Sequence, residues 1–494
     1  MGNKFNTLFK SHFLAPFLLS FFFVLHGVEE NYDFVPLKDA LVLLVTYCIA
    51  TLISIACFTL FFKNVTKACL ISFLLMAIHF FFGSLYDTIK KTWPHSFLTK
   101  YSFLIPLLAF LFISIVIVVK KRKPPSKKMF IYFNVLLVII LFIDSSLLVY
   151  KYFSLKKEND LLLKQFTPYN YSPKPDLYFI VMDEYAGQKE LSDLLNFDNS
   201  SFENDLIKRG FHIIGKSRSN YISTPLSVAS FFNMNYLDFT GIDQEQDRVL
   251  FSYNKIRHSL FLSYLLSEKY IFYNCSIFSF YNHRSPVRPT FLPTAKDLIS
   301  SQTFISRLQK DLGYHLFTTL GLKQNPEEYI YIDQQNNDSI YKETYRIASL
   351  KTGQGKFIYS HLMMPHYPYY FTKNGEARPL NELAVVNKTN PDFYLEYLGY
   401  CNKKILALTD EIQKKSPGAM IILTGDHGFR AFEKKVDESY FFNNFCAVYL
   451  PSNNYSNFYD SLTPVNLFRV LLNTQFGQKL TLVKDSSVIL HKTY

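Results

Sequence analysis

The segment Asp176-Leu-Tyr-Phe-Ile-Val-Met-Asp-Glu-Tyr185 decides the fold expected for the second half of the chain. Residues 177–182 form a short apolar run, which is typical of a buried strand, and Asp183 follows at once. Pro173 and Pro175 precede the run and mark a boundary in the chain. Because a strand buried on both faces belongs to a parallel sheet covered by helices, we expect an α/β domain to begin here.

Strand and helix signals alternate through the rest of this half of the chain. Short apolar runs predict further strands at 211–214, 270–273, 356–361, 419–423 and 445–450. Helical spacing with start and stop signals predicts helices at 202–209, 225–234, 256–267 and 391–414. Residues 276–350 show no such pattern and are expected to form a long loop region. Repeated strand–helix–strand patterning predicts an α/β fold with a mostly parallel sheet sandwiched by helices.

The first 150 residues are much more apolar than the rest and predict a transmembrane domain of five helices. Five apolar stretches approach the length needed to cross a bilayer, at 12–28, 40–62, 68–86, 102–119 and 129–150. The dense basic run 120–128 lies in the fourth gap, whereas the acidic Glu29 and Glu30 lie in the first. Basic loops stay in the cytoplasm, so the chain after residue 150 is expected outside.

This pattern predicts three parts of the chain. A transmembrane domain covers 1–150, a juxtamembrane connector helix covers 151–172, and an extracytoplasmic domain covers 173–494. The expected location is a bacterial inner membrane, which the chain crosses several times. Asp144 lies inside the fifth apolar stretch, where a carboxylate is a candidate for function, although contact with headgroups or water also explains it.

Charge and cysteine content narrow the classes of function. The net charge is +12, but no nucleic-acid recognition motif accompanies it, so we predict no nucleic-acid partner. The six cysteines include no CxxC pair, which argues against a structural zinc site. Pairing among Cys275, Cys401 and Cys446 stays open, with buried free thiols as the favoured state.

Acidic and imidazole side chains follow three of the predicted strands. Asp183 follows 177–182, Asp426 and His427 follow 419–423, and His361 ends 356–361. Because parallel strands end at the same edge of a sheet, these groups are candidate ligands of one divalent ion. Each residue alone is also compatible with a helix cap or a turn. Gly425 and Gly428 are expected to let the backbone turn tightly around Asp426 and His427.

A hydroxyl group for catalysis is expected near residue 224. Ser223, Thr224 and Pro225 stand just before or at the start of the predicted helix 225–234. A hydroxyl there can cap the helix, and helix N–H groups can equally stabilise a phosphate. The residues alone leave both roles open.

Four motifs together resemble the alkaline phosphatase/sulfatase superfamily, in its branch of membrane-anchored phosphoethanolamine and phosphoglycerol transferases. The motifs are DLYFIVMDEY, Thr224-Pro-Leu-Ser-Val, His361-Leu-Met-Met-Pro-His366-Tyr-Pro-Tyr-Tyr and Gly425-Asp426-His427-Gly428-Phe-Arg430. The resemblance implies Thr224 as nucleophile and metal ligand. Asp183, Asp426 and His427 are the other implied ligands, although these transferases usually have Glu where Asp183 stands. His361, His366 and Arg430 are implied substrate-phosphate contacts or partners of a second metal.

The resemblance also implies the reaction. One or two divalent ions, zinc or alternatively manganese, would assist transfer of a phospho-substituent from a phospholipid donor to an envelope glycan or lipid. Three alternatives remain: a phosphodiesterase or phosphatase that uses water, a sulfatase, and a non-catalytic envelope scaffold. Sulfatases resemble this fold but carry Arg where Ser227 stands, and they oxidise a Cys or Ser, here Ser223, to formylglycine. The scaffold is disfavoured because all four implied ligands are present.

Overall fold

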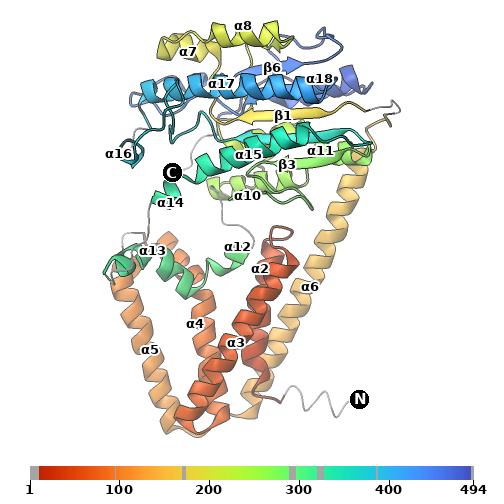
Figure 1. Ribbon diagram of the computed structural model, residues 1–494. Coiled ribbons are helices and arrows are strands. Elements are labelled where there is room, and N and C mark those ends of the chain that lie inside the picture. Colours follow the sequence, from red (N-terminus) through yellow and green to blue (C-terminus); the bar gives the residue numbers. More distant parts are fainter. Residues whose placement is uncertain are drawn as a thin grey trace. The chain divides into compact units, whose positions relative to one another are not determined.

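The computed structural model describes residues 10–94, 96–169, 174–288, 296–319, 327–384 and 388–490. The chain separates into two compact units (Figure 1). The first comprises residues 1–156 and 291–324, and the second comprises 157–290 and 325–494. The domain predicted over 173–494 is therefore interrupted, because one internal segment packs with the apolar helices of the first unit.

Apolar helices make up most of the first unit. They are α2 (Leu14–Glu30), α3 (Leu37–Phe62), α4 (Val65–Thr92), α5 (Tyr101–Lys121) and α6 (Lys127–Leu163), with the short η1 (Phe97–Thr99). Four of them, α3 to α6, are long and apolar enough to cross a membrane, whereas α2 has 17 residues. Residues 151–163, expected in a separate connector, continue α6 without a break, since this stretch contains no glycine or proline.

Two further helices, α12 (Lys296–Ser300) and α13 (Phe304–Thr319), belong to the first unit although they lie far along the sequence. The backbone N–H of Gly83 in α4 donates to the carbonyl of Gln302, at 2.8 Å. Arg307 donates to the carboxylate of Asp87, also in α4, at 2.5 Å. Gln302 approaches so closely that a Cβ on Gly83 would lie 2.6 Å from its backbone oxygen. This contact therefore depends on the glycine.

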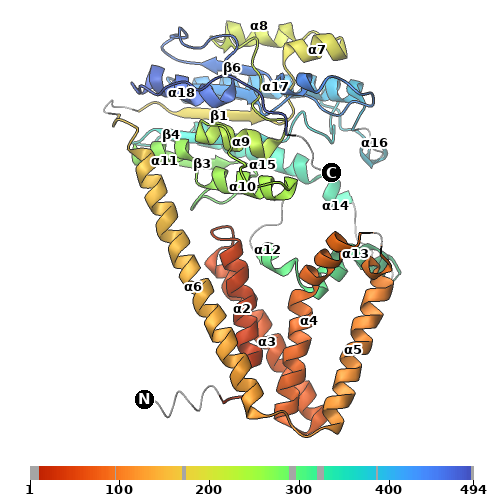
Figure 2. The ribbon, with the colours of Figure 1, turned by 180° about the vertical axis from the view of Figure 1, so that it is seen from behind.

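A six-stranded sheet forms the centre of the second unit, with helices on both of its faces (Figures 1 and 2). The strands are β1 (Leu177–Met182), β2 (His212–Ile213), β3 (Ile271–Cys275), β4 (Lys356–Leu362), β5 (Met420–Gly425) and β6 (Cys446–Tyr449). Their order is β2-β6-β5-β1-β4-β3. The pairs among β3, β4, β1 and β5 are parallel, whereas β6 pairs antiparallel with β5 and β2. The predicted mostly parallel sheet is confirmed.

The helices of the second unit divide between the two faces of the sheet. They are α7 (Gln188–Leu195), α8 (Ser200–Lys208), α9 (Thr224–Asn233), α10 (Glu245–Arg257), α11 (Leu260–Ser267), α14 (Glu327–Ile330), α15 (Ile332–Ala348), α16 (Leu380–Ala384), α17 (Pro391–Lys415) and α18 (Pro464–Gln475), with the 3₁₀ helix η2 (Glu438–Phe442). Phe179 of β1 belongs to a core shared with α9, α11 and α18. Its neighbour Ile180 belongs to a second core shared with α8, α15 and α17. Strand β1 is buried on both faces, as its continuous apolar run predicts.

Two local predictions for this region are wrong. The helix predicted at 256–267 is divided between α10 and α11, because the side chain of Ser259 accepts a bond from the N–H of Leu262 and starts a new helix. The long loop expected at 276–350 contains α12, α13, α14 and α15. All six cysteines are free, and Cys275, Cys401 and Cys446 are buried.

Candidate active site

Strand register brings the predicted site residues together. Val181 near the end of β1 pairs with His361 of β4 on one side and with Thr424 of β5 on the other. Because the three strands are parallel and in step, the residues that follow β1 and β5 emerge at one edge of the sheet. Asp183 and Asp426 therefore lie close together at this edge of the sheet.

Asp183, Asp426 and His427 form a compact cluster of metal-ligand type. One ligand atom from each lies within 4.8 Å of the others, and all three residues are fully buried. Within the described part of the chain, Asp183 Oδ1 and Asp426 Oδ2 have no hydrogen-bond partner. His427 Nδ1 bonds with the carbonyl of Gly428 at 2.8 Å, which leaves Nε2 directed at Asp426 Oδ2, 3.3 Å away. Buried carboxylate oxygens without hydrogen bonds, beside an imidazole nitrogen that faces them, fit a bound divalent cation.

Thr224 places a hydroxyl at the edge of this cluster. It is the first residue of α9, and Thr224 Oγ1 lies 3.4 Å from both Asp183 Oδ2 and His427 Nε2. The N-cap residue is Ser223, whose side chain makes no capping hydrogen bond. The hydroxyl of Thr224 therefore faces the candidate ligands instead of capping its helix.

The side chain of His361 contacts the carboxylate of Asp183. Its Nε2 lies 3.2 Å from Asp183 Oδ2, and its Nδ1 lies 2.8 Å from the hydroxyl of Tyr359. The imidazole is fully buried and both nitrogens have partners. His361 thus contacts a candidate ligand directly, and its expected role toward the substrate phosphate or a second metal stays a prediction. Tyr359 was missed by the sequence prediction, although its position two residues before His361 on one strand places both side chains on one face.

His366 and Arg430 lie around a second carboxylate, that of Glu184. His366 Nε2 is 3.9 Å from Glu184 Oε2, and the backbone N–H of Arg430 donates to Glu184 Oε1 at 3.1 Å. The N–H of Glu184 itself donates to Asp426 Oδ1 at 2.9 Å. Glu184 adopts a left-handed backbone with φ 61°, which is unfavourable for a non-glycine residue and is concentrated at functional sites. The sequence prediction did not include Glu184 in the site. Its position directly after Asp183 was the only feature of the sequence that could have indicated it.

Burial and neighbouring charges shift the pKa values of the cluster. Burial alone would raise the pKa of Asp183, but the imidazoles of His366, His361 and His427 outweigh it and lower this pKa. Burial, with the charge of Asp183, raises the pKa of Asp426 to about 6. Burial, with the charge of Arg430, lowers the pKa of His427 to about 3. Near neutral pH the cluster therefore presents two carboxylates and a neutral imidazole, the forms that bind metal.

His366 behaves differently from His427. Burial opposes its charged form, yet the carboxylates of Asp183 and Glu184 raise its pKa above the ordinary value. A side chain that is 17% exposed can still meet a ligand at the rim of the site. His366 and Arg430 thus bring positive charge to this rim.

Gly425 and Gly428 are required by close approach and not by the tight turn that the sequence suggested. Neither has a positive φ. A Cβ on Gly425 would lie 2.4 Å from the carbonyl oxygen of Tyr185, and one on Gly428 would lie 2.1 Å from a carboxylate oxygen of Glu190. The missing side chains let the loop that carries Asp426 and His427 pack directly against the segment after β1.

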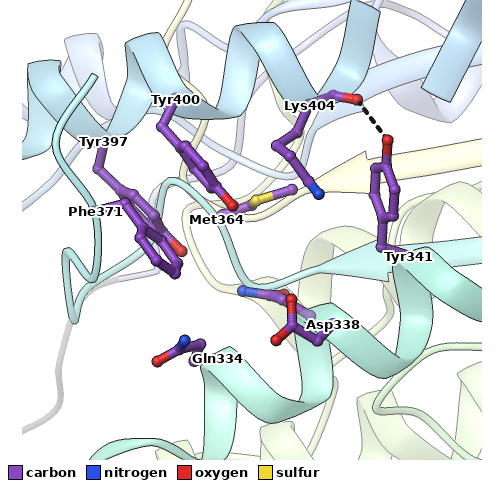
Figure 3. A pocket seen from close by; sticks show the side chains of 9 residues that line it. Gln334, Asp338, Tyr341, Met364, Phe371, Tyr397, Tyr400 and Lys404 are labelled. Atoms are coloured by element: carbon purple, nitrogen blue, oxygen red, sulfur yellow. Dashed lines mark hydrogen bonds between the residues drawn. The ribbon is translucent and has the colours of Figure 1, made fainter. Parts of the chain in front are cut away.

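A small aromatic pocket lies next to the loop that carries His366 (Figure 3). Tyr341, from α15, and Tyr397, Tyr400 and Lys404, from α17, face one another across it, with Met364 from the loop. The ammonium of Lys404 lies 3.8 Å from the ring centre of Tyr341. None of the candidate metal ligands lines this pocket.

Comparison with known protein families finds a match for part of the chain. Residues 239–478 match the family model described as Sulfatase. The range contains His361, His366, Asp426, His427 and Arg430, whereas Asp183 and Thr224 precede it. No curated protein matches the chain.

Solved structures give weaker likenesses. The C-terminal periplasmic domain of EcEptC from Escherichia coli is 11% identical with TM-score 0.38, covering 64% of this chain and 88% of that one. The integral membrane lipooligosaccharide phosphoethanolamine transferase EptA from Neisseria meningitidis is 12% identical with TM-score 0.36, covering 93% and 94%. The 2-O GAG sulfatase BT1596 is 12% identical with TM-score 0.39, covering 64% and 73%. These scores are low and carry no argument about function. The family match is the stronger finding: residues 239–478, just under half of the chain, match the Sulfatase family.

Proposed function

We propose that this enzyme is a membrane-anchored, metal-dependent transferase. It moves a phospho-substituent of the phosphoethanolamine or phosphoglycerol type from a phospholipid to a hydroxyl of an envelope glycan or lipid. One observation carries the proposal: the hydroxyl of Thr224 lies 3.4 Å from Asp183 and from His427, within a buried cluster of metal-ligand type. A nucleophile beside candidate ligands is the arrangement that metal-assisted group transfer needs.

Asp183, Asp426 and His427 would hold the ion, with Thr224 beside it. One imidazole and several carboxylate oxygens suit zinc, with manganese as the alternative. A divalent ion there would supply a Lewis acid that lowers the pKa of the Thr224 hydroxyl and stabilises charge on phosphoryl oxygens.

The reaction is a transfer in two steps. Thr224 Oγ1 forms a bond to phosphorus, the bond from phosphorus to the diacylglycerol oxygen breaks, and that oxygen takes up the proton that Thr224 gives up. The acceptor hydroxyl then attacks phosphorus, the bond to Thr224 Oγ1 breaks, and Thr224 recovers a proton from the acceptor. His366 supports both steps because its raised pKa favours an imidazolium, which can carry the proton to the leaving oxygen.

Positive side chains at the rim support binding of an anionic group. Arg430 is partly exposed and its Nε lies 3.7 Å from Glu184 Oε1, and His366 Nε2 lies 3.9 Å from Glu184 Oε2. A phosphate diester entering this rim would meet two cations while Thr224 approaches its phosphorus.

The position of Ser223 speaks against a sulfatase that depends on formylglycine. Its side chain makes no capping bond, and among the described contacts it is Thr224 that reaches Asp183 and His427. An aldehyde formed at Ser223 would stand one residue away from the hydroxyl that faces the cluster.

Thr224→Ala in the full-length chain tests the proposal, with Ser223→Ala as the matched control. Purified protein in lipid nanodiscs receives a phospholipid with labelled headgroup, and diacylglycerol release and label transfer are measured. We expect Thr224→Ala to lose at least about a thousandfold in turnover, and Ser223→Ala to keep most of it. Label trapped on Thr224 by mass spectrometry identifies the intermediate.

Other outcomes have definite meanings. Unchanged turnover in Thr224→Ala contradicts the nucleophile. Label that passes only to water, with every glycan and lipid acceptor tested, supports a phosphodiesterase instead. Formylglycine at residue 223 supports a sulfatase.

A further inference from the structure

A second cluster of polar side chains lies in the first unit, between the C-terminal end of α2 and the middle of α6. His26 and Glu29 stand three residues apart on α2 and therefore share one face of that helix. Asp144 of α6 faces them, with its Oδ2 3.3 Å from His26 Nδ1. One ligand atom from each of the three lies within 4.8 Å of the others.

The two acidic members of this cluster are buried among apolar helices. Asp144 is 4% exposed and Glu29 is 8% exposed. Within the described part of the chain, neither Asp144 Oδ2 nor His26 Nδ1 makes a hydrogen bond. Leaving a buried carboxylate oxygen and a facing imidazole nitrogen without hydrogen bonds is costly, and a cation bound by both atoms would remove that cost.

The spacing of the two atoms indicates what that group is. Two ligands bound to one zinc ion at about 2.0–2.1 Å, in tetrahedral directions, lie about 3.3 Å apart. The distance between His26 Nδ1 and Asp144 Oδ2 has this value without the geometry of a hydrogen bond. A shared cation accounts for both observations.

We propose that His26, Glu29 and Asp144 form a binding site for a first-row divalent cation such as zinc. One imidazole nitrogen and two carboxylate oxygens are a donor set for such ions, with a fourth position left to solvent. The site is separate from the cluster around Asp426 and does not depend on the proposed transferase activity. It would join α2 to α6, the last apolar helix before the sheet domain.

Neighbouring charges complete the surroundings of this site. Lys151 donates to Glu29 Oε1 at 2.8 Å, which leaves the other oxygen of that carboxylate for the cation. His26 Nε2 lies 3.5 Å from Glu30 Oε1. A carboxylate at the far nitrogen of an imidazole is the usual support of a metal-binding histidine, because it fixes which nitrogen carries the proton.

Zinc stoichiometry tests the proposal in the full-length chain. Protein in nanodiscs is stripped with chelator, loaded with zinc, desalted and measured by inductively coupled plasma mass spectrometry. We expect about two ions per chain, and about one after Asp144→Asn or His26→Gln. Asp87→Asn is the control, because Asp87 also lies on an apolar helix but pairs with Arg307. It should keep both ions.

Asp426→Asn separates this proposal from the proposed function. It should also bind about one ion, and Asp144→Asn combined with Asp426→Asn should bind none. If Asp426→Asn keeps both ions while Asp144→Asn loses one, the catalytic metal fails and the site in the helices stands. If Asp144→Asn and His26→Gln bind as much as the unchanged chain, the cluster is an ion pair and the proposal is overturned.

Cobalt spectra give a readout that a misfolded variant cannot imitate. In Asp144→Cys loaded with cobalt, a thiolate ligand should produce a near-ultraviolet charge-transfer band that the unchanged chain lacks. Asp87→Cys should lack this band too. Its absence from folded Asp144→Cys that still binds cobalt at the catalytic site would overturn the proposal.

Discussion

Asp426 is the residue that is expected to make the proposed metal binding sensitive to acid. It is fully buried and its pKa is raised to about 6, whereas the pKa of Asp183 is lowered and that of His427 falls to about 3. Between pH 4 and pH 6 it is thus the member of this set of three that gains a proton.

This difference predicts a simple pH profile. A protonated carboxyl does not bind zinc, so affinity should be constant above about pH 6 and fall about tenfold per pH unit below it. The measurement is zinc affinity by competition with a chromophoric chelator, in Asp144→Asn so that one site remains. A fall of about a hundredfold per unit would show that two ligands titrate and would contradict the assignment.

At the scale of elements, the candidate site lies at the carboxyl ends of β1 and β5. At the opposite ends of β1 and β4, polar contacts hold the strands together. Asp176, just before β1, accepts bonds from the N–H of Lys356 at 2.9 Å and from the hydroxyl of Ser416 at 2.5 Å. The buried ammonium of Lys356 lies 3.2 Å from the same carboxylate. One side chain therefore ties the starts of β1 and β4 to the end of α17.

Asp176→Asn should destabilise the sheet domain without touching its chemistry. Losing one partner of a buried ion pair costs about 3 kcal/mol. We expect a lower midpoint in chemical unfolding followed by intrinsic fluorescence, with unchanged turnover per folded molecule. Asp193→Asn removes an exposed pair with Lys189 and should leave the midpoint in place. Equal midpoints in the two variants would refute the role of Asp176.

Element prediction succeeded where the pattern is local. The run 177–182 is a strand because continuous apolar residues need burial on both faces, and residues 356–361 form a strand around the apolar centre Phe357-Ile-Tyr359; both strands appear within one residue of the prediction. The convergence of Asp183 with Asp426 also followed from the rule that parallel strands end together. Asp183, Asp426 and His427 are close in the structure for this reason, whereas Thr224 reaches them from the start of α9.

Other features depend on distant contacts that no local pattern reveals. The left-handed backbone of Glu184 is held by the bond from its N–H to Asp426, far along the chain. Helix α15 was expected as loop because its apolar stripe is sparse, yet Ile340 and Ile347 are buried in the core with α17. His361 was expected to contact the substrate phosphate or to partner a second metal, because the sequence shows residue types and not the contacts with Tyr359 and Asp183.

At the scale of the whole molecule, the chain passes between its two units three times, near residues 156, 290 and 324. The segment with α12 and α13 is attached to α4 through Gly83 and Gln302, and Ile299 packs near Gly27 of α2. The family match spans this segment, although the segment packs with the apolar helices.

Gly83→Val should release this segment. A Cβ would lie 2.3 Å from the side-chain oxygen of Gln302 and 2.9 Å from its Cα, so α4 and the turn between α12 and α13 cannot keep their contact. We expect faster hydrogen exchange of the backbone amides in 296–311, measured by mass spectrometry, with zinc at the catalytic site retained. Leu85→Val introduces the same side chain at a residue that is 43% exposed, and should not change exchange. Slow exchange in Gly83→Val would disprove the attachment.

The attachment of α12 and α13 also sets an order of events during synthesis. The last apolar helix, α6, ends at Leu163, yet the helical bundle lacks a part of its packing until residues 296–319 have been made. At about 5–20 residues per second, this delay is on the order of ten seconds. During that time Gly83 has not yet met Gln302. The central sheet of the second unit also still lacks β4, β5 and β6. The bundle can therefore complete its packing only after residues 296–319 have been made, and the sheet domain later still, once β4, β5 and β6 follow.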